Sequence, residues 1–83
     1  MLNVFTVEVV CPATSRSYDF VLPARLEVGE LRHSIIEDIC TYEDISGLID
    51  ADTTLLFCNG DQLFDGADLV SQGVHNGDKI YLV

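Results

Sequence analysis

The sequence predicts an α+β fold in which one mixed sheet carries one main helix on one of its faces. Apolar residues alternate with a period of two near the start of the chain, change to helical spacing at Val28, and return to short apolar runs after residue 53. The length of 83 residues predicts one domain, which spans 1–83.

Two strands are predicted from the alternation of residues 3–10, NVFTVEVV, and residues 17–22, SYDFVL. The inward positions are Phe5, Val7 and Val9 in the first strand and Tyr18, Phe20 and Leu22 in the second. The polar stretch between them, residues 11–16, has the composition of a turn, so the two strands should form a hairpin. Pro23 has no N–H for the ladder and is expected to end the second strand.

A helix is predicted from residue 28, because Val28, Leu31, Ile35 and Ile39 fall on one helical stripe. No Ser, Thr, Asp or Asn stands where an N-cap is expected. The helix should end near residues 40–41, and the acidic stretch 42–53 that follows is expected to be a surface connection with one short helical turn at most.

The second half of the chain predicts three further strands. Residues 54–58, TLLFC, form the first, and the Asn59-Gly60 turn leads into a short segment around 62–64. The stretch 67–74 should be a single helical turn, anchored by Leu69 and Val74. A second turn, at Asn76-Gly77, leads into the final strand, KIYLV.

These elements give the order β-β-α-β-(β)-β. If the final strand pairs with the first strand, the pairing is parallel and the final strand lies in the middle of the sheet. This is the β-grasp architecture.

Composition excludes several classes of function. Fourteen acidic residues against four basic ones give a net charge of −10, which disfavours nucleic acid as a partner. The charge either attracts a basic protein or only keeps the domain in solution. No apolar run is long enough to span a membrane, and the N-terminus has no signal-peptide features, so we expect a cytoplasmic protein without membrane insertion.

No feature predicts an enzyme, a metal or a cofactor. His33 and Glu37 stand at i,i+4 and could pair, but no nucleophile or metal ligand accompanies them. His75 falls in a predicted turn. The acidic residues of the connection, Glu43, Asp44, Asp50 and Asp52, lack the order of a calcium loop. The three cysteines, Cys11, Cys40 and Cys58, are widely spaced and odd in number, which favours free thiols.

Two stretches resemble ubiquitin-like proteins. LEVGELRHSI (26–35) is similar to the helix entry of these domains, and LLFCNGDQLFDGADLVSQGVHNGDKIYLV (55–83) is similar to ubiquitin from its third strand to its last. The shared positions are Leu55, Leu56, Phe57, Gln62, Leu63, Asp65, Gly66, Leu69, Val74, Ile80 and Leu82.

Among ubiquitin-like proteins, the ending GVHNGDKIYLV resembles the small YukD-like (EsaB-like) proteins of Gram-positive bacteria. These proteins accompany the type VII (WXG100) secretion apparatus. The resemblance therefore implies a non-conjugating interaction module, whose partner is a component of the secretion machinery, which could be membrane-bound.

The chain departs from ubiquitin at its end. Ubiquitin continues past its last strand into a flexible tail that ends in Gly-Gly, where the reactive carboxylate lies. Here Val83 stands within the predicted strand, so we expect neither conjugation nor sulfur transfer. The alternative is a modifier or sulfur carrier whose Gly-Gly tail is absent from this sequence.

A recognition surface is expected on the sheet face that the helix leaves open. The alternation described above, continued into the last strands, places Leu55, Phe57, Ile80 and Leu82 on the helix side. The predicted interaction patch on the opposite face consists of Leu56, Tyr81, Val83 and Val21. Leu56 and Val83 match two positions of ubiquitin's apolar recognition patch. Scattered surface apolar residues are the alternative interpretation, and the same face could also support a homodimer.

Overall fold

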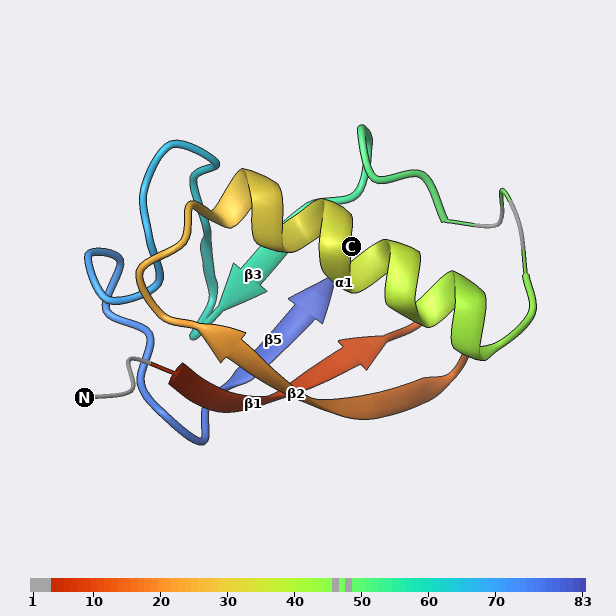
Figure 1. Cartoon of the computed structure of the whole chain (residues 1–83), viewed down its shortest axis with the longest axis horizontal. Coiled ribbons are helices and arrows are strands. Elements are labelled where there is room, and N and C mark those ends of the chain that lie inside the picture. Colours follow the sequence, from red (N-terminus) through yellow and green to blue (C-terminus); the bar gives the residue numbers. More distant parts are fainter. Residues whose placement is uncertain (1–3, 46, 48) are drawn as a thin grey trace.

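Figure 1 shows a computed structural model of the chain, which describes residues 4–45, 47 and 49–83. The elements are β1 (Val4–Cys11), β2 (Arg16–Pro23), α1 (Val28–Tyr42), β3 (Leu56–Cys58), β4 (Asp61–Gln62) and β5 (Lys79–Leu82). The strands form one sheet in the order β2-β1-β5-β3-β4, and α1 crosses one face of it. The predicted α+β β-grasp architecture is confirmed.

The hairpin of β1 and β2 is antiparallel and pairs Val4 with Pro23 at one end and Cys11 with Arg16 at the other. Its strands agree with the predicted ones to within one residue, although Asn3, the predicted start, lies outside the described residues. Pro23 is the last residue of β2, in agreement with its missing N–H.

The predicted stripe of α1 is buried against the sheet, with Ile36 added to its four members. Glu27 occupies the N-cap position and makes no side-chain cap hydrogen bond. The first N–H groups are instead satisfied by a loop far along the chain. Val28 N–H donates to the Ala67 carbonyl at 3.0 Å, and Gly29 N–H donates to the Asp65 carbonyl at 3.1 Å. The start of the helix is therefore fixed by tertiary contacts.

Both Asn-Gly pairs are turns. Asn59 and Gly60 have φ values of 54° and 83°, and they form the two-residue loop between β3 and β4. At the second pair, the Thr6 N–H donates to Asn76 Oδ1, and the Gly77 N–H donates to the Thr6 carbonyl, each at 2.7 Å. This turn is thus joined to β1, and β5 leaves it parallel to β1, as predicted.

The stretch 67–74 is a series of turns rather than a helical turn, and Leu69 and Val74 are buried in it as expected. The connection 42–53 is partly outside the described residues, which omit 46 and 48. Within the described residues, no helix is long and apolar enough to cross a membrane.

The prediction of which face the residues of β3 occupy was wrong. Leu56 and Cys58 point into the core, whereas Phe57 is half-buried on the other face and Leu55 is exposed. The stretch 54–58 is apolar almost throughout, so it has no alternation from which the facing could be set. The helix-side assignments in the other strands are confirmed, because polar residues alternate with apolar ones there.

Candidate functional site

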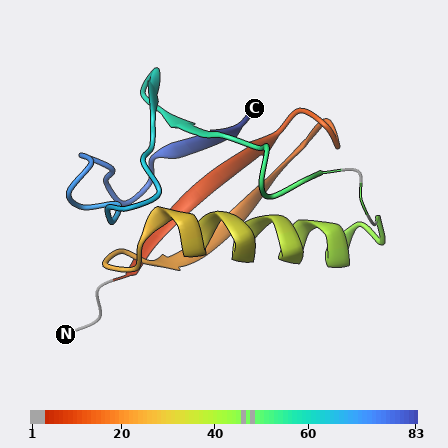
Figure 2. The ribbon, with the colours of Figure 1, turned by 90° about the horizontal axis from the view of Figure 1, so that it is seen from above.

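The face of the sheet opposite α1 carries a group of apolar side chains on its three middle strands. Figure 2 shows this face of β5 and β3 turned away from the helix. Tyr81 on β5 is paired with Val10 on β1 and with Phe57 on β3. Beside it, Val83 and Leu55 exchange two backbone hydrogen bonds of 2.9 and 3.0 Å. We call these five residues the outer patch: Val10, Leu55, Phe57, Tyr81 and Val83.

The outer patch is accessible. Val83 is 70% exposed and Tyr81 is 42% exposed, while Phe57 and Val10 are half-buried between their neighbours. A tyrosine and a phenylalanine side by side offer a large apolar area at little cost in side-chain entropy. The chemistry available here is non-covalent contact with another apolar surface.

Phe64 extends the outer patch toward the edge of the sheet. The register that pairs Phe57 with Gln62 continues, because Leu63 N–H donates to the Leu56 carbonyl at 2.8 Å. This places Phe64 across from Leu55, and its side chain is 72% exposed. The Gln72 side chain holds the Phe64 backbone, accepting from its N–H at 2.6 Å and donating to its carbonyl at 2.9 Å. The side chain is therefore presented to solvent from a fixed backbone.

A charged row borders the outer patch on one side. Glu8 on β1 is paired with Asp19 on β2 and with Lys79 on β5. Val21 lies beyond this row, paired with Thr6. Val21 is 66% exposed, but the charged row separates it from Tyr81, so it does not belong to the outer patch.

Leu56 is a second correction to the predicted interaction patch. Its side chain is 2% exposed and belongs to the core cluster, so a partner cannot reach it. Tyr81 and Val83 lie on the outer face as expected. Leu55, Phe57 and Phe64 were missed, although the sequence held a usable signal. A two-residue Asn-Gly hairpin loop pairs residue 58 with residue 61. The same register pairs Phe57 with Gln62 and Leu55 with Phe64, so these residues share one face of the sheet.

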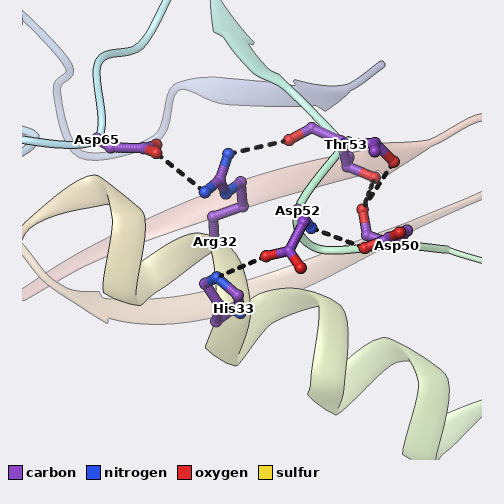
Figure 3. Close-up of polar contacts among 7 residues, drawn as sticks. Arg32, His33, Asp50, Asp52, Thr53 and Asp65 are labelled. Carbon is purple, nitrogen blue, oxygen red and sulfur yellow. Dashed lines mark hydrogen bonds and ion pairs between the residues drawn. The ribbon is translucent and has the colours of Figure 1, made fainter.

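The remaining polar candidates make structural contacts. Figure 3 shows the residues of α1 that reach the connection. His33 Nε2 lies 3.6 Å from Asp52 Oδ1, which replaces the predicted pairing with Glu37. Arg32, the residue before His33, donates to the Thr54 carbonyl at 3.4 Å and to Asp65 Oδ2 at 2.9 Å. These two residues tie α1 to the approach to β3 and to the loop after β4.

No arrangement of reactive groups emerges in the part of the chain that the structure describes. There, no group of three or more His, Cys, Asp or Glu side chains lies together as a metal site would need. The three cysteines are free, and Cys11 and Cys58 are buried. Burial, together with the nearby Asp78 carboxylate, raises the pKa of the Cys58 thiol. Because the thiolate is the nucleophilic form, Cys58 is a poor nucleophile.

Comparison with solved structures identifies the fold. An N-terminal ubiquitin-like domain determined in solution has a TM-score of 0.74 and 22% identity, over 100% of this chain and 76% of that one. A ubiquitin-like domain of an Arabidopsis thaliana protein has a TM-score of 0.73 and 18% identity, over 98% and 77%. A protein designed de novo on the basis of ubiquitin has a TM-score of 0.77 and 12% identity, over 98% and 88%.

These likenesses show that the chain has a ubiquitin-like fold, and at these identities they extend no further than the fold. No protein-family model and no curated protein matches the sequence.

Proposed function

We propose that this ubiquitin-like domain is a non-enzymatic module that binds a protein partner non-covalently through the outer patch. The observation that carries the proposal is the row of Val10, Tyr81 and Phe57, which lies on the sheet face that α1 does not cover. An apolar surface of this kind bordered by charged residues is typical of protein interfaces.

The composition of the outer patch fits an interface that depends on a few residues. Tyrosine is enriched among the side chains that dominate binding energy, and Tyr81 lies at the centre of the patch with apolar neighbours on both sides. Phe64 is a candidate second anchor, because its backbone is already fixed before binding. The net charge of −10 favours a partner with a basic rim.

We further propose that the protein works in the bacterial cytoplasm as an accessory of the type VII (WXG100) secretion system, and that its partner is a component of that machinery. The support for this setting is the resemblance of GVHNGDKIYLV to the YukD-like proteins. The alternative function is a modifier or sulfur carrier, which would be covalently joined to its targets or to sulfur.

The experiment is deletion of the gene in its source organism, followed by complementation. We expect deletion to reduce export of WXG100 proteins, and wild-type protein to restore it. Tyr81→Asp, which places a charge in the centre of the outer patch, should not restore export. The matched control is Val70→Asp, because Val70 is an exposed apolar residue that lies two residues after Asp68, which pairs with Glu27 at the start of α1 and not with the strands of the patch. Both variants should stay folded, with a free energy of unfolding within about 1 kcal/mol of wild type in urea titration.

Unchanged export after deletion would overturn the secretion role. Equal restoration by Tyr81→Asp and Val70→Asp would overturn the outer patch as the binding face. The intact mass of the protein isolated from its own cells distinguishes non-covalent binding from the alternative function. A covalent conjugate or an added sulfur changes the mass, whereas non-covalent binding does not.

A further inference from the structure

The tripeptide Asn-Gly-Asp occurs twice in the chain, at residues 59–61 and 76–78, and forms a turn each time. In an Asn-Gly pair, the asparagine amide is open to attack by the next backbone nitrogen, because glycine has no Cβ to obstruct it. Asn59 and Asn76 are both exposed, as are the glycines that follow them. A side chain added at either glycine would meet no atom beyond its chain neighbours within 4 Å. Exposure and space therefore do not distinguish the two turns.

The second turn is held by hydrogen bonds to β1. Asn76 Oδ1 accepts from the Thr6 N–H at 2.7 Å, and the Gly77 N–H donates to the Thr6 carbonyl at 2.7 Å. The ends of the turn are also joined. The Asp78 N–H donates to the His75 carbonyl at 3.1 Å, and the His75 N–H donates to Asp78 Oδ2 at 2.8 Å. The side-chain amide of Asn76 and the backbone nitrogen of Gly77 are therefore each fixed by a bond to Thr6.

The first turn, between β3 and β4, has freer reacting groups. Within the described residues, no hydrogen bond engages the Asn59 side chain or the Gly60 N–H. In Figure 2 this loop projects from the sheet on the side away from α1. Reaction at Asn59 therefore requires rotation about single bonds, whereas reaction at Asn76 first requires hydrogen bonds to break.

We infer that Asn59 is a site of spontaneous deamidation, and that the fold protects Asn76 from the same reaction. The chemistry depends only on the two turns, so it holds whether or not the outer patch binds a partner.

The reaction proceeds through a cyclic imide. The Gly60 nitrogen, after losing its proton to the solvent, attacks Cγ of Asn59. The new N–C bond closes a succinimide ring, and the side-chain nitrogen takes up a proton and leaves as ammonia. Water then opens the ring at one of the two bonds between its nitrogen and its carbonyls, giving aspartate or isoaspartate. The net reaction consumes water, releases ammonia and needs no oxidant or reductant.

Deamidation at Asn59 would alter the hairpin that places part of the outer patch. The two-residue loop sets the register that pairs Phe57 with Gln62. In isoaspartate the main chain passes through the former side chain, so the loop gains a backbone atom and no longer matches a two-residue turn. Either product also adds a negative charge beside Asp61. β4 has two residues, so few backbone hydrogen bonds oppose its displacement together with Phe64.

The test compares the two turns within one chain. The full chain is kept folded in mildly alkaline buffer, and tandem mass spectrometry of digested samples assigns conversion to Asn59 or Asn76. We expect conversion at Asn59 to be at least about tenfold faster, because hydrogen bonds must break before Asn76 can react. In concentrated guanidinium chloride the two rates should agree within about threefold, since the unfolded turns share one tripeptide sequence.

Three results would contradict the inference. Equal rates in the folded chain would overturn the protection of Asn76. A rate difference of the same size in guanidinium chloride would assign it to the preceding residues, Cys58 and His75, and overturn its origin in the fold. An absence of conversion at Asn59 in the folded chain, over a time in which the unfolded chain converts completely, would overturn the site itself.

The effect on the hairpin is tested with the matched variants Asn59→Gln and Asn76→Gln, because glutamine keeps the amide but has to close a larger ring. Each chain is labelled with ¹⁵N and compared with its own spectrum before incubation. The amide signals of β3, β4 and Phe64 should change in wild type and in Asn76→Gln, and stay constant in Asn59→Gln. A change in Asn59→Gln as large as in wild type, or an unchanged wild-type spectrum after conversion, would overturn the effect on the hairpin.

Discussion

Leu56 and Phe57 are neighbours on β3, but they lie in opposite surroundings. Leu56 points toward α1 and is almost completely buried, whereas Phe57 lies beside Tyr81 on the face that no helix covers. The comparison shows that one short strand can contribute to both the core and the candidate interface. Residues of similar hydrophobicity therefore have different roles according to which face of the sheet they occupy.

The largest expected effect contrasts the two faces of β5. Ile80→Ala should lower the free energy of unfolding by about 2–5 kcal/mol, because Ile80 is fully buried at the centre of the sheet. Tyr81→Ala, one residue along, should lower it by no more than about 1 kcal/mol. Urea titration of both variants measures the difference. Similar losses would mean that the two faces contribute equally to stability.

An intermediate effect is expected where α1 is joined to the hairpin. Tyr18→Phe should lower the free energy of unfolding by about 1 kcal/mol at pH 7, since it removes the hydroxyl that bonds to Glu43 and Thr14.

The same variant carries a pH dependence. Burial, and the hydrogen bond to Glu43, raise the pKa of Tyr18 above its ordinary value near 10. The unfolded chain therefore loses this proton at a lower pH than the folded chain does. The contribution of Tyr18 is complete below pH 10 and is lost as the pH rises through the folded pKa. Urea titrations at pH 7 and at about pH 11 should show the gap between wild type and Tyr18→Phe closing. A gap that widens at high pH would contradict this account.

The smallest effect is expected at Val21, which is exposed but lies outside the outer patch. Val21→Ser should change the free energy of unfolding by less than about 0.5 kcal/mol. In the complementation experiment it should restore export as well as wild type does. Failure to restore export, at unchanged stability, would show that the binding face crosses the charged row of Asp19, Glu8 and Lys79.

Much of the fold could be predicted from local patterns. Alternation in β1 and β2, the stripe on α1 and the two Asn-Gly turns each specify an element by themselves. The apolar stripe also predicted the start of α1 at residue 28, but the contacts that fix this start could not be derived, because its N–H groups are satisfied by carbonyls of residues 65 and 67, which lie more than 35 positions away. Such long-range pairing leaves no mark near Val28.

The candidate site was predicted less completely for a related reason. Tyr81 in β5 and Val83 just after it alternate with buried residues, and Lys79 marks the outer face. β3 has no charged residue to mark either face, so which of its residues point into the core depends on the turn that follows it.

The most direct test of the outer patch is a matched pair of truncations on β3 and the residue before it. Leu55→Ala and Leu56→Ala remove the same atoms from adjacent positions, which are 36% and 2% exposed. We expect Leu56→Ala to lower the free energy of unfolding by about 3 kcal/mol and Leu55→Ala by about 1 kcal/mol. Equal losses, or a larger loss for Leu55→Ala, would place Leu56 on the outer face and contradict the assignment of the outer patch.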